Sequence, residues 1–192
     1  MKDFLSALPF DIFGLEVIPG LQPCLEIGSS FAENARQKAE YYSQFSEVLT
    51  IADDSGLVVD ALDGQPGIYS ARFVSESATD EERYREVLFR MRNVPSHERT
   101  ARFVCCVVMA LEGTMLDIFE GTVEGLIVRE PRGENGFGYD AIFLVPKLGK
   151  TLAELGPSVK LAVSHRGQAL QKLFPALQKP ELLTVSRKTC LD

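Results

Sequence analysis

Apolar residues recur at helical spacing in three parts of the chain. One part follows Ser30, whose S-x-x-E sequence is typical of a helix start, and another follows Thr79, which opens T-D-E-E. The third follows Ser164. The apolar faces consist of Phe31, Ala35, Ala39 and Tyr42 in the first, Tyr84, Val87, Leu88 and Met91 in the second, and Ala169, Leu170, Leu173, Phe174 and Leu177 in the third. The spacing therefore predicts three amphipathic helices.

Short apolar runs lie between these segments and predict β-strands. They cover residues 48–52, 57–62, 102–111, 115–123, 126–128 and 141–145. The sequence Glu112-Gly113-Thr114 is typical of a hairpin turn, and residues 151–155 favour a short helical turn. This order of elements predicts an α/β fold with a curved, mixed sheet and flanking helices.

The composition is that of one ordinary domain. The 192 residues are 45% hydrophobic and 24% charged, and no repeat or long linker divides them, so we expect a single domain over residues 1–192 with residues 179–192 as a tail. The net charge of −7 excludes a polynucleotide bound through a basic surface. No window approaches the roughly 20 apolar residues of a membrane span, so no membrane partner is expected. The four cysteines show no C-x-x-C spacing, which favours a reduced, cytoplasmic location.

The first candidate site is Asp53-Asp54-Ser55-Gly56. Two carboxylates directly after an apolar strand are suitable ligands for a hard divalent cation, and one of them could orient or deprotonate a water molecule. The alternative is a turn, because Asp, Ser and Gly are all turn formers. The apolar runs on both sides place the acids at the rim of the sheet, which favours the functional interpretation.

The helix after Ser30 carries two candidate residues. At about 100° per residue, Lys38 lies close to the apolar stripe rather than on the outer face. The alternative to a functional role is that its aliphatic stem packs along the stripe while the ammonium stays in water. Glu33 could serve in a site or as the glutamate of a capping box.

A glycine-dense loop covers residues 133–140 and ends in Phe137-Gly138-Tyr139-Asp140. An aromatic ring can stack on a nucleobase, and glycine lets a ligand approach the backbone closely. The two common phosphate-binding motifs, G-x-x-x-x-G-K-[ST] and G-x-G-x-x-G, do not occur in the chain. A hairpin or crossover loop with a core aromatic residue explains the same pattern, so both interpretations remain open.

The last candidate is Ser164-His165-Arg166-Gly167, with Lys160 shortly before it. At a helix start, these residues supply hydrogen-bond donors and positive charge that suit an anion or a carbonyl-rich base. A nucleophilic serine is not expected, because adjacent Ser and His residues do not form a triad and no G-x-S-x-G segment occurs.

Five segments carry a common resemblance when they are taken in order. They are Phe31-x-Glu33-Asn34-Ala35-x-x-Lys38-Ala39, Ala52-Asp53-Asp54-Ser55-Gly56-Leu57, Pro66-Gly67-Ile68-Tyr69-Ser70-Ala71-Arg72, Gly136-Phe137-Gly138-Tyr139-Asp140 and Ser164-His165-Arg166-Gly167. Together they resemble the inosine triphosphate pyrophosphatase family, whose members clear non-standard purine nucleotides. The resemblance extends from Ser30 to Leu177.

The resemblance implies Mg²⁺-dependent cleavage of ITP, dITP or XTP, small-molecule purine nucleoside triphosphates, to the monophosphate and pyrophosphate. It also implies a homodimer and an elongated α/β fold with two lobes enclosing a nucleotide cleft. Glu33 and Asp54 are then expected to hold Mg²⁺, with Asp53 as a further ligand, and Asp54 to prepare the attacking water. The expected substrate contacts are Ser55 and Lys38 for phosphate, Phe137, Gly138, Tyr139 and Asp140 for the nucleoside, Lys160, His165 and Arg166 for the base and its polar neighbours, and Arg72 as a further contact.

The start of the chain departs from the resemblance. Family members usually begin with a strand and a [ST]-x-N-x-x-K-x-x-E segment, and Met1-Lys2-Asp3-Phe4 is similar to the tail of that segment. We therefore expect that the opening strand, the asparagine and the first lysine are absent. Two alternatives stay open: a related pyrophosphatase of another modified nucleotide, and a shortened, dimeric nucleotide-binding module with little catalysis.

Overall fold

The computed structural model describes residues 11–46 and 48–178. The predictions made for Met1-Lys2-Asp3-Phe4 and for the tail at residues 179–192 lie outside the described residues.

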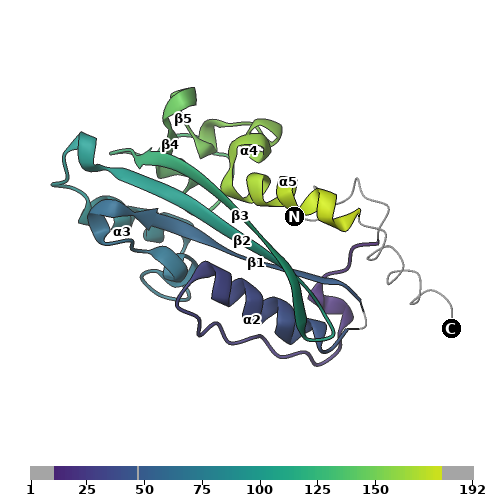
Figure 1. Ribbon diagram of the computed structural model, residues 1–192. Helices are drawn as coiled ribbons and strands as arrows, with labels where there is room; N and C mark the ends of the chain where they lie inside the picture. Colours follow the sequence, from purple (N-terminus) through teal and green to yellow (C-terminus); the bar gives the residue numbers. More distant parts are fainter. Residues whose placement is uncertain (1–10, 47, 179–192) are drawn as a thin grey trace. The chain divides into compact units, whose positions relative to one another are not determined.

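One sheet holds the strands in the order in which they occur along the chain. They are β1 (Thr50–Val59), β2 (Thr100–Leu111), β3 (Thr114–Ile127), β4 (Phe143–Val145) and β5 (Lys150–Thr151). Figure 1 shows the long strands β1, β2 and β3 side by side. The short strands continue the sheet through antiparallel pairs, with Leu126 opposite Leu144 and Leu144 opposite Thr151. The predicted α/β class is confirmed.

The hairpin predicted between β2 and β3 is present. Glu112 and Gly113 alone separate the two strands, and both have positive φ, at 50° and 76°. A two-residue loop of this conformation matches the twist of the strands that it joins. A glycine at the second position avoids the steric cost that a side chain meets at such a φ.

Strand β1 corrects one prediction. The sequence predicted two strands, at 48–52 and 57–62, with Asp53 and Asp54 at the rim between them, but Asp53, Asp54, Ser55 and Gly56 all lie within one continuous strand. Residues 60–62 form a 3₁₀ helix instead of extending that strand. The turn propensity of these residues is weak against strand pairing, and the side chain of Asp54 has partners on a helix rather than in a local turn.

The three predicted helices are confirmed as α2 (Phe31–Ser43), α3 (Asp80–Arg90) and α5 (His165–Leu177). Ser30 and Thr79 cap the first two, because each hydroxyl accepts a hydrogen bond from the backbone N–H three residues later. Thr79 forms the complete capping box, whereas the carboxylate of Glu33 reaches back to Ser29 rather than to the backbone of Ser30.

Shorter helices complete the chain. The short helix α4 (Pro157–Val163) was not predicted. The 3₁₀ segments are Leu15–Val17, Asp60–Leu62, Gly67–Arg72, Ser96–Glu98, Asp140–Ile142, Pro146–Leu148 and Leu152–Glu154. The last of these confirms the short helical turn expected at 151–155, and the segment at 140–142 delays the start of β4 to Phe143.

The chain divides into two compact units. The first consists of Met1–Asp54, Cys106–Phe119 and Ala169–Asp192, and the second of Ser55–Cys105 and Glu120–Gln168. A single apolar cluster forms the core of the second unit, and its fully buried members include Leu57, Val87, Met91, Phe143 and Leu152. The boundary in β1 falls between Asp54 and Ser55, so consecutive residues belong to different units.

Within residues 11–46 and 48–178, no helix combines the length and the apolar character that crossing a membrane requires.

Candidate active site

The first unit contains a largely buried group of polar and charged side chains, which we call the Asp54 cluster: Glu26, Asn34, Lys38 and Asp54. The ammonium of Lys38 lies 2.9 Å from Oδ1 of Asp54 and 3.0 Å from Oε1 of Glu26. Asn34 stands one helical turn before Lys38 on α2 and donates from Nδ2 to Oδ2 of Asp54 at 3.4 Å. Helix α2 therefore fixes both oxygens of the Asp54 carboxylate.

Burial and the hydrogen bonds between the charged groups together set the pKa values of Asp54 and Lys38. It raises the pKa of Asp54 above its usual value, and this effect outweighs the hydrogen bond and charge of Lys38, which work in the opposite direction. For Lys38, burial works to lower the pKa, but the hydrogen bonds and charges of Asp54 and Glu26 outweigh it and raise the pKa. Lys38 is therefore cationic at neutral pH, and Asp54 is a stronger base than an exposed aspartate.

Glu33 lies at the first turn of α2. Its Oε2 accepts hydrogen bonds from the backbone N–H of Ser29 at 2.7 Å and from the Ser29 hydroxyl at 2.8 Å. The Ser29 backbone bond and then its hydroxyl lower the pKa of Glu33. Glu33 is therefore held as a carboxylate, the form in which it could bind a cation.

The structure does not bring Asp53 into the Asp54 cluster. Successive side chains of a strand point to opposite faces, so Asp53 and Asp54 lie on opposite faces of β1. Across residues 11–46 and 48–178, no three His, Cys, Asp or Glu side chains form a group that could hold a metal ion by themselves. A cation at Asp54 would therefore need oxygen ligands from a substrate or from water.

The second unit contains another group of side chains, three of them charged, which we call the Lys160 cluster: Ser55, Phe137, Asp140, Lys160 and Arg166. The ammonium of Lys160, on α4, forms an ion pair with Oδ2 of the buried Asp140. The same oxygen accepts a hydrogen bond from the backbone N–H of Phe137 at 2.9 Å. Asp140 thus connects α4 to the glycine-dense loop.

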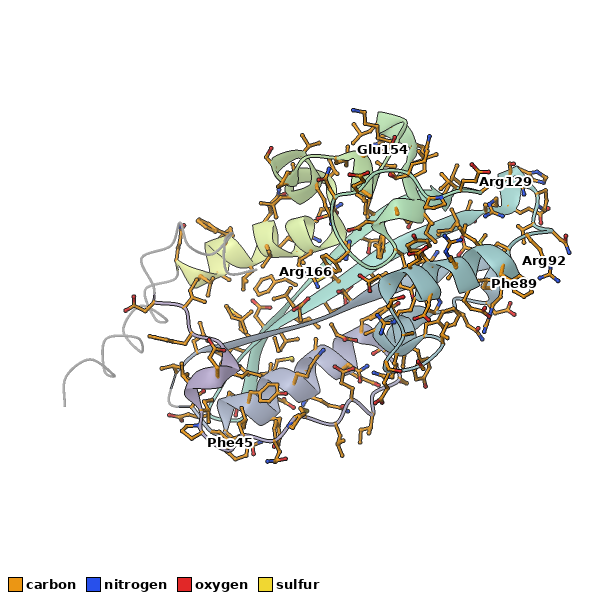
Figure 2. The ribbon with its side chains drawn as sticks, turned by 180° about the vertical axis from the view of Figure 1, so that it is seen from behind. Phe45, Phe89, Arg92, Arg129, Glu154 and Arg166 are labelled. Atoms are coloured by element: carbon orange, nitrogen blue, oxygen red, sulfur yellow. The ribbon has the colours of Figure 1, made fainter. Side chains whose placement is uncertain are left out.

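Two cations flank the exposed ring of Phe137. The ammonium of Lys160 lies 4.9 Å from the ring centroid, and the guanidinium carbon of Arg166 lies 5.6 Å from it. Arg166 extends from the first turn of α5 toward the sheet (Figure 2), and its Nη2 donates to the hydroxyl of Ser55 at 3.0 Å. The structure thus brings Phe137, which was expected at the nucleoside, together with Lys160 and Arg166, which were expected at the base.

His165 is buried against an aromatic ring. Its imidazole stacks on Phe103 with a centroid distance of 4.7 Å and an interplanar angle of 8°. Burial, followed by the charges of Arg166 and Lys160, lowers its pKa to about 3, so the ring is neutral at physiological pH. Its Nδ1 has no hydrogen-bond partner among the described residues.

One of the predicted contacts, Tyr139, is placed differently. The side chain of Tyr139 lies in the core, where its hydroxyl donates to the backbone oxygen of Ser70 at 2.9 Å and burial raises its pKa. Tyr139 therefore anchors the loop rather than presenting its ring. The guanidinium carbon of Arg72 lies 5.1 Å from the ring centroid of Tyr69, and its expected contact with the substrate stays a prediction.

Sequence reasoning did not assign a role to three residues that contact the candidate site. Asn34 had a recognisable signal, because it lies four residues before Lys38 on the same helix. Glu26 and Phe103 had none, because Glu26 precedes the helix and Phe103 falls within an apolar strand.

Comparison with known proteins gives consistent matches. A sequence model of the Ham1 family matches residues 1–176. The chain is 46% identical over 169 residues to the dITP/XTP pyrophosphatase of Geobacter sulfurreducens, covering 88% of this chain and 85% of that protein. It is 47% identical over 173 residues to the dITP/XTP pyrophosphatase of Escherichia coli, covering 86% and 87%.

Solved structures agree with these matches. The Staphylococcus aureus Ham1 protein is similar with a TM-score of 0.85 and 42% identity, covering 92% of both chains. A HAM1 protein from Coxiella burnetii is similar with a TM-score of 0.82 and 40% identity, covering 92% of this chain and 90% of that one. The resemblance inferred from five short motifs is thereby confirmed over most of the chain.

Proposed function

Because the chain belongs to the Ham1 family, we propose that it hydrolyses the non-standard purine nucleotides ITP, dITP and XTP to the monophosphate and pyrophosphate. The names of its relatives from Geobacter sulfurreducens and Escherichia coli support this class of reaction. The observation that carries the proposal is the largely buried Asp54 carboxylate, whose oxygens are held by Lys38 and Asn34. An oriented carboxylate beside a lysine is suited to preparing a water molecule and binding phosphate.

We propose Mg²⁺ as the cofactor, held by Asp54 and Glu33. Carboxylate oxygens are the ligands that Mg²⁺ prefers, and it is commonly bound by one or two carboxylates together with substrate phosphates. The donor set here fits this pattern, because Glu33 is kept ionised and no larger cluster of acids occurs among the described residues. Bound Mg²⁺ would neutralise the charge that develops on the leaving pyrophosphate.

The residues of the Asp54 cluster would act on the water and the phosphates. Asp54 accepts the proton of the attacking water, which its raised pKa favours. Lys38 holds that carboxylate in one orientation and offers positive charge to the phosphates. Ser55 follows Asp54 in β1, so its side chain points to the opposite face, where its hydroxyl accepts a hydrogen bond from Arg166. A chain with net charge −7 needs such local cations to bind a triphosphate.

The residues of the Lys160 cluster would recognise the base. Phe137 is exposed and can stack on the purine. Arg166 and Lys160 carry only donors, and they would donate hydrogen bonds to the 6-carbonyl oxygen of hypoxanthine or xanthine. They would meet another donor in the 6-amino group of adenine. His165 is neutral, so its ring adds a hydrogen-bonding edge without further charge.

The resemblance supports two more proposals, a homodimer and a cytoplasmic location. Light scattering during size-exclusion chromatography tests the first, because a dimer has twice the 21.2 kDa mass of the chain. Fractionation of cells that produce the protein tests the second.

A coupled assay for pyrophosphate release tests the proposed reaction directly. The substrates are ITP, dITP, XTP, ATP and GTP, each with Mg²⁺ and with excess chelator. We expect Mg²⁺-dependent release of pyrophosphate from the first three at rates well above those for ATP and GTP. Release of orthophosphate, or equal rates across the panel, would contradict the proposal. A modified pyrimidine triphosphate is added as a further substrate, and its turning over fastest would reassign the substrate.

A further inference from the structure

The loop at residues 136–140 is held at successive positions. The backbone N–H of Phe137 donates to Asp140, and the hydroxyl of Tyr139 donates to the backbone oxygen of Ser70. Between them, the backbone N–H of Gly138 donates to Oδ2 of Asp80 at 2.6 Å. Asp80 is the first residue of α3 and is far from the loop in sequence. This hydrogen bond therefore connects the start of α3 to the loop that carries Phe137.

The carboxylate of Asp80 is itself fixed. Its other oxygen, Oδ1, lies 3.1 Å from Nη1 of Arg83, one turn later on α3. The side chain of Arg83 is only 13% exposed, and its Nη2 donates to the backbone oxygen of Glu76 at 3.4 Å. A carboxylate that is held at one oxygen by a largely buried arginine presents its second oxygen in a defined direction.

The hydrogen bond at Gly138 restricts the residue before it. The N–H of Gly138 belongs to the peptide unit that also contains the carbonyl of Phe137, and a peptide unit is planar. Fixing this N–H therefore limits the backbone rotation at Phe137 and, with it, the direction of the phenyl ring. Gly138 has φ of +61°, a conformation that glycine adopts without the steric cost of a side chain.

We propose that Asp80 is a positioning residue for the purine base: by accepting the Gly138 N–H, it holds the Phe137 ring in the orientation that stacks on the base. This role rests on the proposed function, because it assumes that Phe137 contacts the base. Asp80 touches neither the reacting phosphates nor the Asp54 carboxylate in this role. Its loss is expected to weaken nucleotide binding and leave the chemical step unchanged.

The competing explanation is that Asp80 only stabilises the start of α3. Acidic residues in the first turn of a helix are favourable there, and Glu81 and Glu82 share that turn. Glu81 offers a matched control, because it is the next residue, is exposed, and pairs with Arg85 on the same helix. Glu81→Ala removes the same charge from the same turn without touching the loop.

The experiment compares wild type with Asp80→Ala, Asp80→Asn and Glu81→Ala. Calorimetry measures the Kd for IMP, and steady-state kinetics with ITP separates KM from kcat. For Asp80→Ala we expect Kd and KM to rise about tenfold with kcat within about twofold of wild type, as the loss of one charge-assisted hydrogen bond implies. For Asp80→Asn, whose amide oxygen can still accept the Gly138 N–H, we expect a rise of about threefold or less. Glu81→Ala is expected to match wild type.

Amide hydrogen exchange adds a readout at the contact itself. The Gly138 amide should exchange faster in Asp80→Ala but not in Glu81→Ala, at a temperature where circular dichroism finds every variant folded. Equal Kd values in Asp80→Ala and Glu81→Ala would overturn the proposal, as would a lower kcat with unchanged KM. Failure of the proposed function looks different, because wild type itself would then neither bind IMP nor release pyrophosphate.

Discussion

Two lysine–aspartate pairs of similar burial lie in the two units. In the Lys38–Asp54 pair the side chains are 16% and 12% exposed, and in the Lys160–Asp140 pair they are 19% and 6% exposed. Each lysine stands on a helix and reaches an aspartate 16 or 20 residues away. The pairs themselves are therefore nearly equivalent in chemistry.

Their surroundings make them different. Glu26 adds a second carboxylate to Lys38, so that group carries more negative than positive charge. Beside Lys160 the additional charge is the guanidinium of Arg166, which shares the Phe137 ring with it, and His165 stays neutral. The third charged residue therefore leaves the first group with more negative charge and the second with more positive charge.

Replacement of Asp54 by asparagine should have the largest effect. Asn keeps the shape of the side chain but cannot take a proton from water at neutral pH, so we expect kcat for ITP to fall about a thousandfold while binding largely survives. Asp53→Asn is the matched control on the opposite face of β1, and we expect less than a tenfold change. Turnover like wild type in Asp54→Asn, measured by pyrophosphate release, would remove Asp54 from the proposed mechanism.

Replacing the lysine of each cluster should change a different kinetic parameter. Lys38→Met leaves Asp54 without its charged partner and the phosphates without a cation, so kcat/KM should fall about a hundredfold with a lower kcat. Lys160→Met should raise KM instead and leave kcat nearly unchanged, because this lysine is proposed to contact the base. The comparison fails if both variants change the same kinetic parameter.

The neutral state of His165 predicts a pH-dependent loss of stability. The pKa of His165 is about 3 in the folded chain and 6.5 without the fold. Above pH 6.5 the imidazole is neutral in both states and contributes no penalty. As pH falls below 6.5, only the unfolded chain takes up the proton, so stability decreases until the pH reaches about 3.

Replacement of His165 measures this effect. Between pH 8 and pH 5 we expect wild type to lose about 2 kcal/mol more unfolding free energy than His165→Gln, as determined from urea titrations. The matched control is His97→Gln, because His97 is 79% exposed at the side chain. The unfolding free energy of this variant should change with pH as that of wild type does. Parallel pH profiles for wild type and His165→Gln would show that the imidazole is not kept neutral by burial.

The local features of the fold could be predicted from the sequence. The helix starts at Ser30 and Thr79 depend on hydrogen bonds to a backbone N–H only three residues later, so a short sequence pattern reveals them. The hairpin at Glu112 likewise joins two strands that are adjacent in sequence. The same local reasoning misplaced the end of β1, because Asp53 and Asp54 have turn propensities that strand pairing overrides. It also missed α4, whose seven residues are too few for a periodic pattern.

The contacts of the candidate site could be predicted less completely. The motifs supplied Lys38 and Asp54, but the ion pair between them joins an α-helix to a strand and depends on the tertiary structure. The contact between Arg166 and Ser55 spans 111 residues, and no local pattern encodes it. The burial of Tyr139 could not be predicted either, because aromatic residues occur both in cores and in binding loops.

Initial rates measured over a grid of Mg²⁺ concentration and nucleotide would test most directly whether metal binding and base recognition depend on different residues. The comparison is between Glu33→Gln, at a proposed Mg²⁺ ligand, and Arg166→Ala, at a proposed base contact. Glu33→Gln should raise the Mg²⁺ concentration for half-maximal rate about tenfold and leave the preference for ITP over ATP unchanged. Arg166→Ala should reduce that preference about tenfold and leave the Mg²⁺ dependence unchanged. The opposite pattern, or changes in both properties for both variants, would contradict the account that different residues bind the metal and recognise the base.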